Sequence, residues 1–418
     1  MSLGDDHPRR SRPHELRGRA SVDDVLDLIA RRIGRLESER VVLPETAGRV
    51  LAAQIRAEVS VPSFDRAAMD GYAVRGEETQ GASPARPVPF RYVGATRPGR
   101  RCEIVVGPGE ALEITTGSAL PQGADSVVRV ESTRKEGETV WVQEPFPPGR
   151  HVGRVGEDIE TGTVVLEGNR RLRPQDLAVL RALGITSVDV IRRPKVTVII
   201  TGDELIAAGN PGRVFQIADT NSVMLEALIT RDGGRPWVVG PIPDDRDRIR
   251  AEITEAANTS DVLLISGGSS AGPEDYAPGL IEELGKLVVH GVALRPAAPS
   301  GVGFLGQVPV VLLPGNPVSC LCAYDFFAGP IVRVQGGRAR EWPYRTQVLP
   351  LASALPSSLG RTDYARVRIE NGKLEPLSIS GASILSSTTR ADGFVVIPAQ
   401  VDEYPAGALV TLWLYDLD

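Results

Sequence analysis

The sequence predicts a multi-domain α/β plus β protein, built around one parallel-sheet α/β/α domain and two small β modules. From about residue 194 to residue 336, continuous apolar runs alternate with stretches of helical periodicity. Unbroken apolar strands that alternate with helices are typical of a parallel sheet buried on both faces. Short β-rich runs separated by Pro and Gly turns occupy residues 88–150 and return after Gly337, as in all-β modules. At 418 residues, the usual domain size predicts about two to four units.

The N-terminal region opens with an amphipathic helix. Behind Ser21 as N-cap, apolar residues recur at helical spacing at Val22, Val25, Leu26, Leu28, Ile29, Ile33 and Leu36. A second helix is predicted over residues 175–183, ending near Gly184. The β runs that lie between these two helices are residues 90–93, 103–106, 126–130 and 139–142.

The central segment supplies the strands and helices of the α/β domain. Its continuous apolar runs are residues 195–201, 236–240, 261–266 and 308–313. The helical stretches that alternate with them are residues 221–231, 245–257, 276–284 and 318–334. The C-terminal β runs are residues 346–350, 365–369, 394–397 and 408–414.

Composition narrows the function classes. The formal net charge of −6 disfavours a nucleic-acid binder, and the one basic run, at Arg9, Arg10 and Arg12, lies in a tail (residues 1–14) that we expect to be disordered. The three cysteines lack the spacing and the histidines of a zinc site. No apolar signal core and no run of about 20 apolar residues occurs. These features predict a soluble cytoplasmic protein with neither a membrane nor a nucleic acid as partner.

Polar motifs follow the strands of the predicted parallel sheet. In such sheets, ligands bind at the carboxyl ends of the strands. The motifs at these ends are Gly202-Asp203-Glu204, Pro243-Asp244-Asp245, Ser266 to Gly272 followed by Glu274-Asp275, and Pro314-Gly315-Asn316-Pro317. Carboxylates on adjacent strand ends repel one another unless a cation or a proton joins them, and Mg²⁺ is the natural cation. The glycines let backbone N–H groups approach an anion.

Each of these features also has a purely structural interpretation. Asp244 could be a helix N-cap, and Glu204 and Asp275 could be acids that favour helix N-termini. A Gly-Gly loop also serves as a tight strand-to-helix turn. Asp70-Gly71 has the composition of a tight turn, and Thr116 that of a turn-stabilising threonine. The residues by themselves leave these alternatives open.

The segment Pro62–Val74, which reads PSFDRAAMDGYAV, resembles the signature of the molybdopterin molybdotransferase family, to which MoeA and the gephyrin E domain belong. Further motifs similar to those of the family follow in the same order. They are Thr116–Asp125, Gly156–Asp158, Thr201–Leu205, Ser266–Gly268 and Leu313–Ser319. The resemblance covers nearly everything after residue 20.

The resemblance implies a fold of four domains in an elongated homodimer. On this chain it assigns residues 15–57 and 150–193 to one discontinuous α+β dimerisation domain, 58–149 to an inserted β module, 194–337 to an α/β molybdopterin-binding domain and 338–418 to a C-terminal β module. It also implies a Mg²⁺-dependent transferase of molybdenum cofactor biosynthesis, which inserts molybdate into adenylylated molybdopterin and releases AMP. Other proteins of the same biosynthesis would be its transfer partners.

The resemblance also assigns roles to residues. Glu204, Asp244 and Asp275 match family residues, which implies that they hold Mg²⁺ and act in catalysis. Asp70, Thr116 and Asp158 resemble catalytic residues supplied from outside the α/β domain, some of them across the dimer interface. The Thr116 hydroxyl would donate to phosphate or to a water. The pterin phosphate would be held by Gly267, Gly268, Ser269, Pro314, Gly315, Asn316 and Pro317.

The oxyanion half of the predicted site is thinner than in the family. Where the family has a Lys-Pro-Gly-Lys-Pro segment, this chain reads Arg295-Pro296-Ala297-Ala298-Pro299, and another family lysine is Gly291 here. The residues expected near molybdate are Arg295, Ser319, Arg366 and Ser383. Arginine offers a fork of donors suited to tetrahedral oxyanions.

Alternatives to a molybdate-inserting enzyme therefore stay open. The chain could insert tungstate, or it could be a diverged paralogue that carries molybdopterin or the finished cofactor, or acts as a scaffold. A different nucleotide-dependent transferase that uses the same cleft is another alternative. A nicotinamide dehydrogenase is disfavoured, because no Gly-x-Gly-x-x-Gly follows the first α/β strand.

Overall fold

The computed structural model describes residues 18–207, 209, 214–269, 275–378 and 381–415. The predicted tail, residues 1–14, lies outside the described residues, as do Ser270, Ala271, Gly272 and Glu274 of the glycine-rich motif. The chain forms two compact units: unit 1 comprises Met1–Glu39, Gly48–Val50 and Val190–Asp418, and unit 2 comprises Arg40–Ala47 and Leu51–Asp189. The finer division into four domains stays a prediction.

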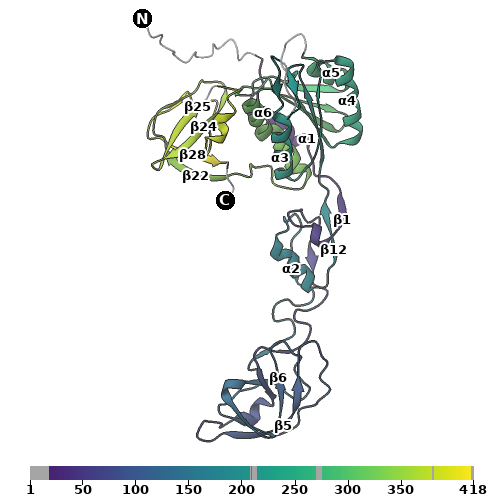
Figure 1. The fold of residues 1–418 in the computed structure, drawn as a ribbon, viewed down its shortest axis with the longest axis vertical. Helices are drawn as coiled ribbons and strands as arrows, with labels where there is room; N and C mark the ends of the chain where they lie inside the picture. The colour runs from purple at the N-terminus through teal and green to yellow at the C-terminus, as the bar shows by residue number, and fades with distance from the viewer. Residues whose placement is uncertain (1–17, 208, 210–213, 270–274, 379–380, 416–418) are drawn as a thin grey trace. The chain divides into compact units, whose positions relative to one another are not determined.

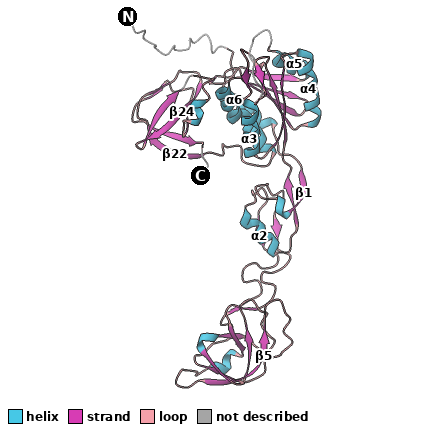
Figure 2. Cartoon of the chain, viewed as in Figure 1, coloured by secondary structure: helices cyan, strands magenta, loops and turns pink. Residues whose placement is uncertain are grey.

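Unit 1 contains a six-stranded sheet with helices packed against it (Figures 1 and 2). Its strand order is β16 (Arg235–Ile242), β13 (Lys195–Thr201), β17 (Val262–Ser266), β21 (Val308–Leu313), β20 (Gly301–Leu305) and β18 (Lys286–His290). Neighbouring strands from β16 to β21 are parallel, whereas β20 and β18 are antiparallel to their neighbours. The four strands predicted for the parallel sheet are parallel as expected, whereas β20 and β18 were not predicted and add an antiparallel edge. The turn at Gly306 joins β20 directly to β21, and a link this short cannot make the crossover that a parallel pair needs.

Helices cover both faces of this sheet, as predicted (Figure 1). Along β13, Val196, Val198 and Ile200 belong to one core, whereas Ile199 belongs to the other, as the two-residue period of a strand requires. The first core includes side chains of α1 (Val22–Arg32), α3 (Asn221–Asp232), α6 (Pro317–Ala323) and α7 (Gly329–Gln335). The second includes side chains of α4 (Arg246–Thr259) and α5 (Tyr276–Leu284).

Two helix predictions need correction at their ends or interior. Helix α1 begins with a capping box between Ser21 and Asp24 and ends at Arg32, with Ile33 as its C-cap, so Leu36 lies beyond it. The stretch predicted as one helix over residues 318–334 is α6 and α7 joined by a π-helical segment, η5 (Tyr324–Ala328). The carboxylate of Asp325 in η5 is fully buried and accepts hydrogen bonds from the Tyr344 hydroxyl at 2.9 and 3.0 Å.

The C-terminal part of unit 1 forms a second six-stranded sheet, which covers its own apolar core. Its order is β19 (Leu294–Arg295), β24 (Thr362–Glu370), β26 (Gly393–Ile397), β28 (Leu409–Leu414) and β22 (Arg345–Pro350), with β25 (Lys373–Ser378) paired to β24. Shorter elements are β14 (Leu205–Ile206) with β15 (Ile217–Ala218), β23 (Leu355–Pro356) with β27 (Glu403–Tyr404), and α8 (Ser386–Thr389).

Unit 2 contains a six-stranded, mostly antiparallel sheet. Its order is β7 (Ser126–Arg129), β4 (Gly71–Val74), β6 (Glu110–Ile114), β5 (Val88–Thr96), β9 (Thr139–Val142) and β8 (Thr133–Glu136). The run at residues 103–106 was predicted as a strand and is not one, because its backbone bond from Val106 N–H goes to the turn carbonyl of Gln122 instead of to a strand. The predicted second helix is α2 (Pro174–Ala182).

The other short elements between residues 38 and 191 are strand pairs and 3₁₀ turns. The strand pairs are β1 (Ser38–Val42) with β12 (Ser187–Ile191), β2 (Ile55–Arg56) with β11 (Val164–Leu166), and β3 (Arg66–Ala67) with β10 (Val152–Gly153). Single 3₁₀ turns are η2 (Leu43–Glu45), η3 (Gly76–Thr79) and η4 (Val130–Ser132). In the described part of the chain, no helix combines the length and the apolar character needed to cross a membrane.

Candidate functional site

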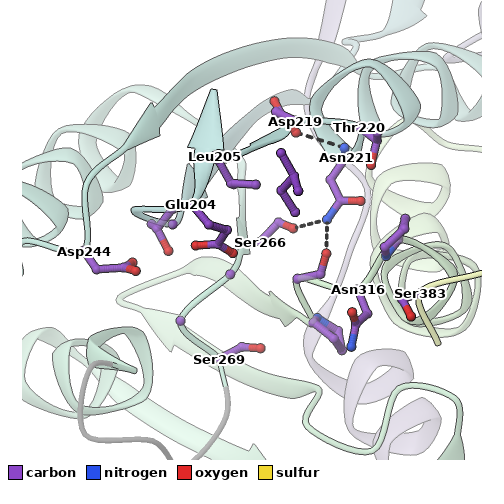
Figure 3. Close-up of a pocket in the computed structure, with 18 of the residues that line it drawn as sticks. Glu204, Leu205, Asp219, Thr220, Asn221, Asp244, Ser266, Ser269, Asn316 and Ser383 are labelled. Atoms are coloured by element: carbon purple, nitrogen blue, oxygen red, sulfur yellow. Dashed lines mark hydrogen bonds between the residues drawn. The ribbon is translucent and has the colours of Figure 1, made fainter. Parts of the chain in front are cut away.

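A cavity of about 750 Å³ opens where the carboxyl ends of β13, β17 and β21 meet (Figure 3). Most residues that the sequence assigned to the α/β site line it: Glu204, Asp244, Gly267, Gly268, Ser269, Asp275, Pro314, Gly315, Asn316, Pro317 and Ser383. The position follows from the topology, because parallel neighbouring strands end at the same edge and their loops converge there.

The glycines allow these loops to approach one another closely. Gly267 has a φ of +99°, and a Cβ there would lie 2.1 Å from the Thr201 carbonyl oxygen, so a larger residue does not fit between the ends of β13 and β17. A Cβ on Gly315 would lie 3.7 Å from the Cα of Gly267. Three strand ends are thus brought into one backbone-lined wall of the cavity.

Acidic side chains, Glu204, Asp244 and Asp275 among them, also line the cavity. The Asp244 N–H donates to Asp203 Oδ1 at 3.1 Å, and the Asp203 N–H donates to Asp244 Oδ2 at 3.3 Å, which ties the loops after β13 and β16 together. Burial raises the pKa of Asp244 above its ordinary value, and the negative charges of Asp203 and Glu204 add to this rise, which outweighs the opposing hydrogen bond from the Asp203 N–H. The helix N-cap in this loop is the neighbouring Asp245, whose carboxylate accepts from the Arg248 N–H at 2.8 Å. Asp244 is therefore not held in place by a capping role.

The donor set of this acidic part fits a hard cation. Asp244 Oδ1 and Thr201 Oγ1 are both buried without a well-formed hydrogen bond among the described residues, and the Thr201 hydroxyl lies close enough to the Asp244 carboxylate to oppose the rise in its pKa. The described residues contain no preassembled group of three or more His, Cys, Asp or Glu ligands. Mg²⁺ needs no such cage, since it keeps several waters and is usually held by one or two carboxylates together with substrate phosphates.

Sequence reasoning missed Asn221, the first residue of α3 (Figure 3). Its Nδ2 donates to Ser266 Oγ at 2.9 Å and to the Gly315 carbonyl at 2.8 Å. Asp219, which also lines the cavity, accepts from the N–H groups of Asn221 and Ser222 at 2.9 and 3.1 Å. The sequence predicts Asn221 only as the first residue of a helix; the available signal for a site role is that it is a polar residue at the carboxyl edge of the sheet.

Three of the residues expected near the oxyanion lie outside the cavity lining. Arg295 forms a bidentate pair with Asp363, which is fully buried. Arg366 is fully buried in β24, and this burial lowers the pKa of its guanidinium. Ser319 is buried in α6. Ser383, by contrast, lines the cavity, beside the start of α6, where the Val318 N–H donates to the Ala382 carbonyl at 3.0 Å.

The remaining predicted residues belong to unit 2. The carboxylate oxygen Oδ1 of Asp70 accepts hydrogen bonds from both the N–H and the hydroxyl of Thr116, each at 2.7 Å. These two bonds lower the pKa of Asp70. The Thr116 hydroxyl thus donates to Asp70 in this structure. The next residue is Gly71, and a larger residue does not fit there because its Cβ would lie 1.9 Å from the Val128 carbonyl oxygen. Asp158 is exposed in the loop before β11.

Comparison with known families confirms the predicted relationship. Residues 20–184 match the MoeA N-terminal region (domain I and II), residues 197–334 match the probable molybdopterin binding domain, and residues 348–415 match the MoeA C-terminal region (domain IV). Together these matches define a protein of molybdenum cofactor biosynthesis with a MoeA-like multidomain fold.

Whole-chain relatives agree. The chain is 33% identical to molybdopterin molybdenumtransferase 2 of Mycobacterium tuberculosis, over 94% of this chain and 99% of that one. It is 32% identical to molybdopterin molybdenumtransferase of Bacillus subtilis, over 94% and 93% of the two chains. The crystal structure of the molybdopterin biosynthesis MoeA protein of Pyrococcus horikosii superposes with a TM-score of 0.82 at 35% identity, covering 95% of this chain and 99% of that one. The chain therefore belongs to the MoeA family of molybdopterin molybdenumtransferases.

Proposed function

We propose that the protein inserts molybdate into adenylylated molybdopterin and releases AMP, in a reaction that depends on Mg²⁺. The observation that carries this proposal is the convergence of carboxylates, among them Glu204, Asp244 and Asp275, and of glycine-containing loops on one cavity at the strand ends. A volume of about 750 Å³ also lies within the range of roughly 300 to 1,000 Å³ that is typical of small-molecule sites. Membership of the family supplies the substrate class.

The glycine loops have the task of binding phosphate and pterin. Gly267, Gly268 and Gly315 line the cavity and carry no side chain of their own, so their backbone groups can approach an anion. Ser269 and Asn316 add short polar side chains to the same wall. These groups would orient the pterin end of the substrate, and their fixed positions limit the motion of the bond to be cleaved.

The acids have the task of holding Mg²⁺, with Glu204, Asp244 and Asp275 as its candidate ligands. When bound there, Mg²⁺ neutralises phosphate charge and stabilises the charge that develops on the departing AMP. In the absence of a cation, the same carboxylates repel a phosphoanhydride. Substrate binding and AMP release should therefore both require the metal.

The residues of unit 2 complete the proposal. We propose a cytoplasmic homodimer in which Asp70, Thr116 and Asp158 act on the substrate held by a second copy of the chain. Asp70 suits such a role, because two hydrogen bonds from Thr116 hold its exposed carboxylate in one orientation. Transfer partners from the same biosynthesis would deliver the pterin and receive the product.

A second candidate function is that of a molybdopterin or cofactor carrier. The described residues that line the cavity include no Arg, Lys or His, and Arg295 is paired with Asp363. A weak oxyanion site would leave pterin binding intact while slowing metal insertion. Preference for tungstate over molybdate is a variant of the first function that the same experiment distinguishes.

The test is AMP release from adenylylated molybdopterin by the purified protein, with Mg²⁺ or with EDTA. Each condition is measured with molybdate, with tungstate and with neither oxyanion. Mg²⁺-dependent release that one oxyanion stimulates supports the transferase and identifies its metal. Tight pterin binding with no release under any condition would favour the carrier.

A further inference from the structure

Asn221 joins three elements that border the cavity. It starts α3, and its amide nitrogen bonds Ser266 at the end of β17 and Gly315 in the loop after β21. The side chain is 6% exposed, and Figure 3 shows both bonds reaching from α3 to the two loops. A single amide group thus spans elements that are far apart in the sequence.

The orientation of this amide is fixed by its partners. The Gly315 carbonyl can only accept a hydrogen bond, so the NH₂ end of Asn221 must face it. The same nitrogen donates to Ser266 Oγ, which leaves the Ser266 hydroxyl proton to point elsewhere. Asn221 Oδ1 is buried with no hydrogen-bond partner among the described residues. Burying an acceptor without a partner costs free energy, and the two hydrogen bonds that the Asn221 nitrogen donates offset this cost.

Helix capping does not explain the side chain. The first N–H groups of α3 are satisfied by Asp219, whose carboxylate accepts from Asn221 and Ser222. The side-chain amide of Asn221 is therefore not needed for capping, and both hydrogen bonds that its nitrogen donates go to the loops after β17 and β21. Both of its partners line the cavity, and so does Asn221 itself.

We infer that Asn221 is a positioning residue, which holds the loops after β17 and β21 at the separation that binds the pterin substrate. The identity of the substrate in this inference rests on the proposed function, whereas the positioning of the two loops rests on the hydrogen bonds alone. With the amide removed, Ser266 and Gly315 lose their shared donor and the wall between them loosens. Ser266 and Gly315 adjoin the residues proposed to bind the substrate, whereas Glu204 and Asp244 lie in other loops and Asp275 lies at the far end of the loop after β17. The effect should therefore fall on binding before it falls on chemistry.

The variants are Asn221→Ala and Asn221→Asp, with Asn258→Ala as matched control. Asn258 lies exposed on α4, where its Nδ2 donates only to the Thr254 carbonyl of the same helix. Aspartate has the shape of asparagine, but its carboxylate cannot donate to the Gly315 carbonyl. Alanine favours helix formation, so α3 should persist in that variant.

We expect the KM for adenylylated molybdopterin to rise about tenfold in both Asn221 variants, the size expected for losing two neutral hydrogen bonds, with kcat changed less than about threefold. Hydrogen exchange should quicken in peptides covering residues 262–269 and 308–316 together. The control should match the unaltered protein in both measurements. A merely structural role would lower the folded fraction, which reduces apparent kcat and leaves KM unchanged.

The two hypotheses fail differently. If the unaltered protein releases no AMP, the proposed function fails, and the exchange measurement still decides the inference. If both Asn221 variants keep the KM and the exchange rates of the Asn258 control, Asn221 does not position these loops and the inference is overturned.

Discussion

Asp203 and Asp244 exchange reciprocal hydrogen bonds, the backbone N–H of each donating to the carboxylate of the other at 3.1 and 3.3 Å. The loops after β13 and β16 are therefore fixed to each other at the edge of the cavity. Burial raises the pKa of Asp244, and the nearby negative charges of Asp203 and Glu204 raise it further. Negative charge is concentrated here without any cation among the residues that line the cavity and that the structure describes.

The acid cluster predicts a separation of catalysis from stability. Asp244→Ala and Asp275→Ala should each reduce Mg²⁺-dependent AMP release by about 100-fold or more, since each removes a proposed metal ligand. Asp245→Ala is the control: it removes the N-cap of α4 and should cost about 1 kcal/mol of stability with activity kept. Steady-state kinetics and urea unfolding measure the two effects. Full turnover in the Asp244 and Asp275 variants would refute the assignment.

Asp244 also predicts a pH dependence of stability. Because its pKa is raised above the ordinary 3.8, the folded chain binds this proton more tightly than the unfolded chain does. The free energy of unfolding should therefore fall as the pH rises from 3.8 through the raised pKa, and remain lower above it. Asp244→Asn removes this ionisation and should be more stable than the unaltered protein at about pH 7, but not at about pH 3. Urea unfolding in EDTA at both pH values tests this; an Asn variant that is less stable at neutral pH would contradict it.

The close backbone approach at Gly267 predicts that two Gly→Ala substitutions will have opposite effects on stability. Gly267→Ala places a Cβ 2.1 Å from the Thr201 carbonyl in a backbone with a φ of +99°, and should cost about 1–3 kcal/mol or more. Gly279→Ala, within α5, meets nothing within 4 Å and should stabilise the protein by up to about 1 kcal/mol. Thermal unfolding of both variants gives the comparison. Equal effects of the two changes would mean that the close approach at Gly267 is not a constraint.

The thinned oxyanion half predicts a gain of function. Ala298→Lys adds a cation next to Pro299, which lines the cavity, and should lower the KM for molybdate several-fold. The same cation at position 291 should be less effective, because Gly291 has a φ of +89°, where a side chain is strained. Molybdate titrations of AMP release compare the two variants. No change in the Ala298 variant would indicate that charge at this rim does not limit oxyanion use.

The regular elements around the site were predictable because each has a local cause. The residues of β13, β21 and α5 were predicted as found, since continuous apolar runs and helical spacing depend on burial alone. Strands β18 and β20 were not assigned, although their residues are short apolar runs beside a Gly306 turn. The antiparallel edge depends on a turn that joins neighbours, and periodicity carries no information about that pairing.

Site residues were predictable where their position depends only on the ends of neighbouring strands. They were not predictable where it depends on hydrogen bonds or ion pairs with residues far away in the sequence. Glu204, Asp244 and Gly267 line the cavity because the ends of neighbouring strands meet. Arg295 was expected at the oxyanion, yet it pairs with Asp363, which lies in β24 of the other sheet. Asn221 was missed for the same reason, since its partners are Ser266 and Gly315. Such long-range pairs follow from the fold and leave no local pattern.

The most direct test of the central claim is the stoichiometry of insertion, measured as molybdenum bound to pterin per AMP released in one turnover with Mg²⁺ present. The proposed transferase predicts about one molybdenum for each AMP, and no release in the Asp275→Ala variant. AMP release with no molybdenum in the product, or pterin that stays adenylylated while bound, would contradict the claim.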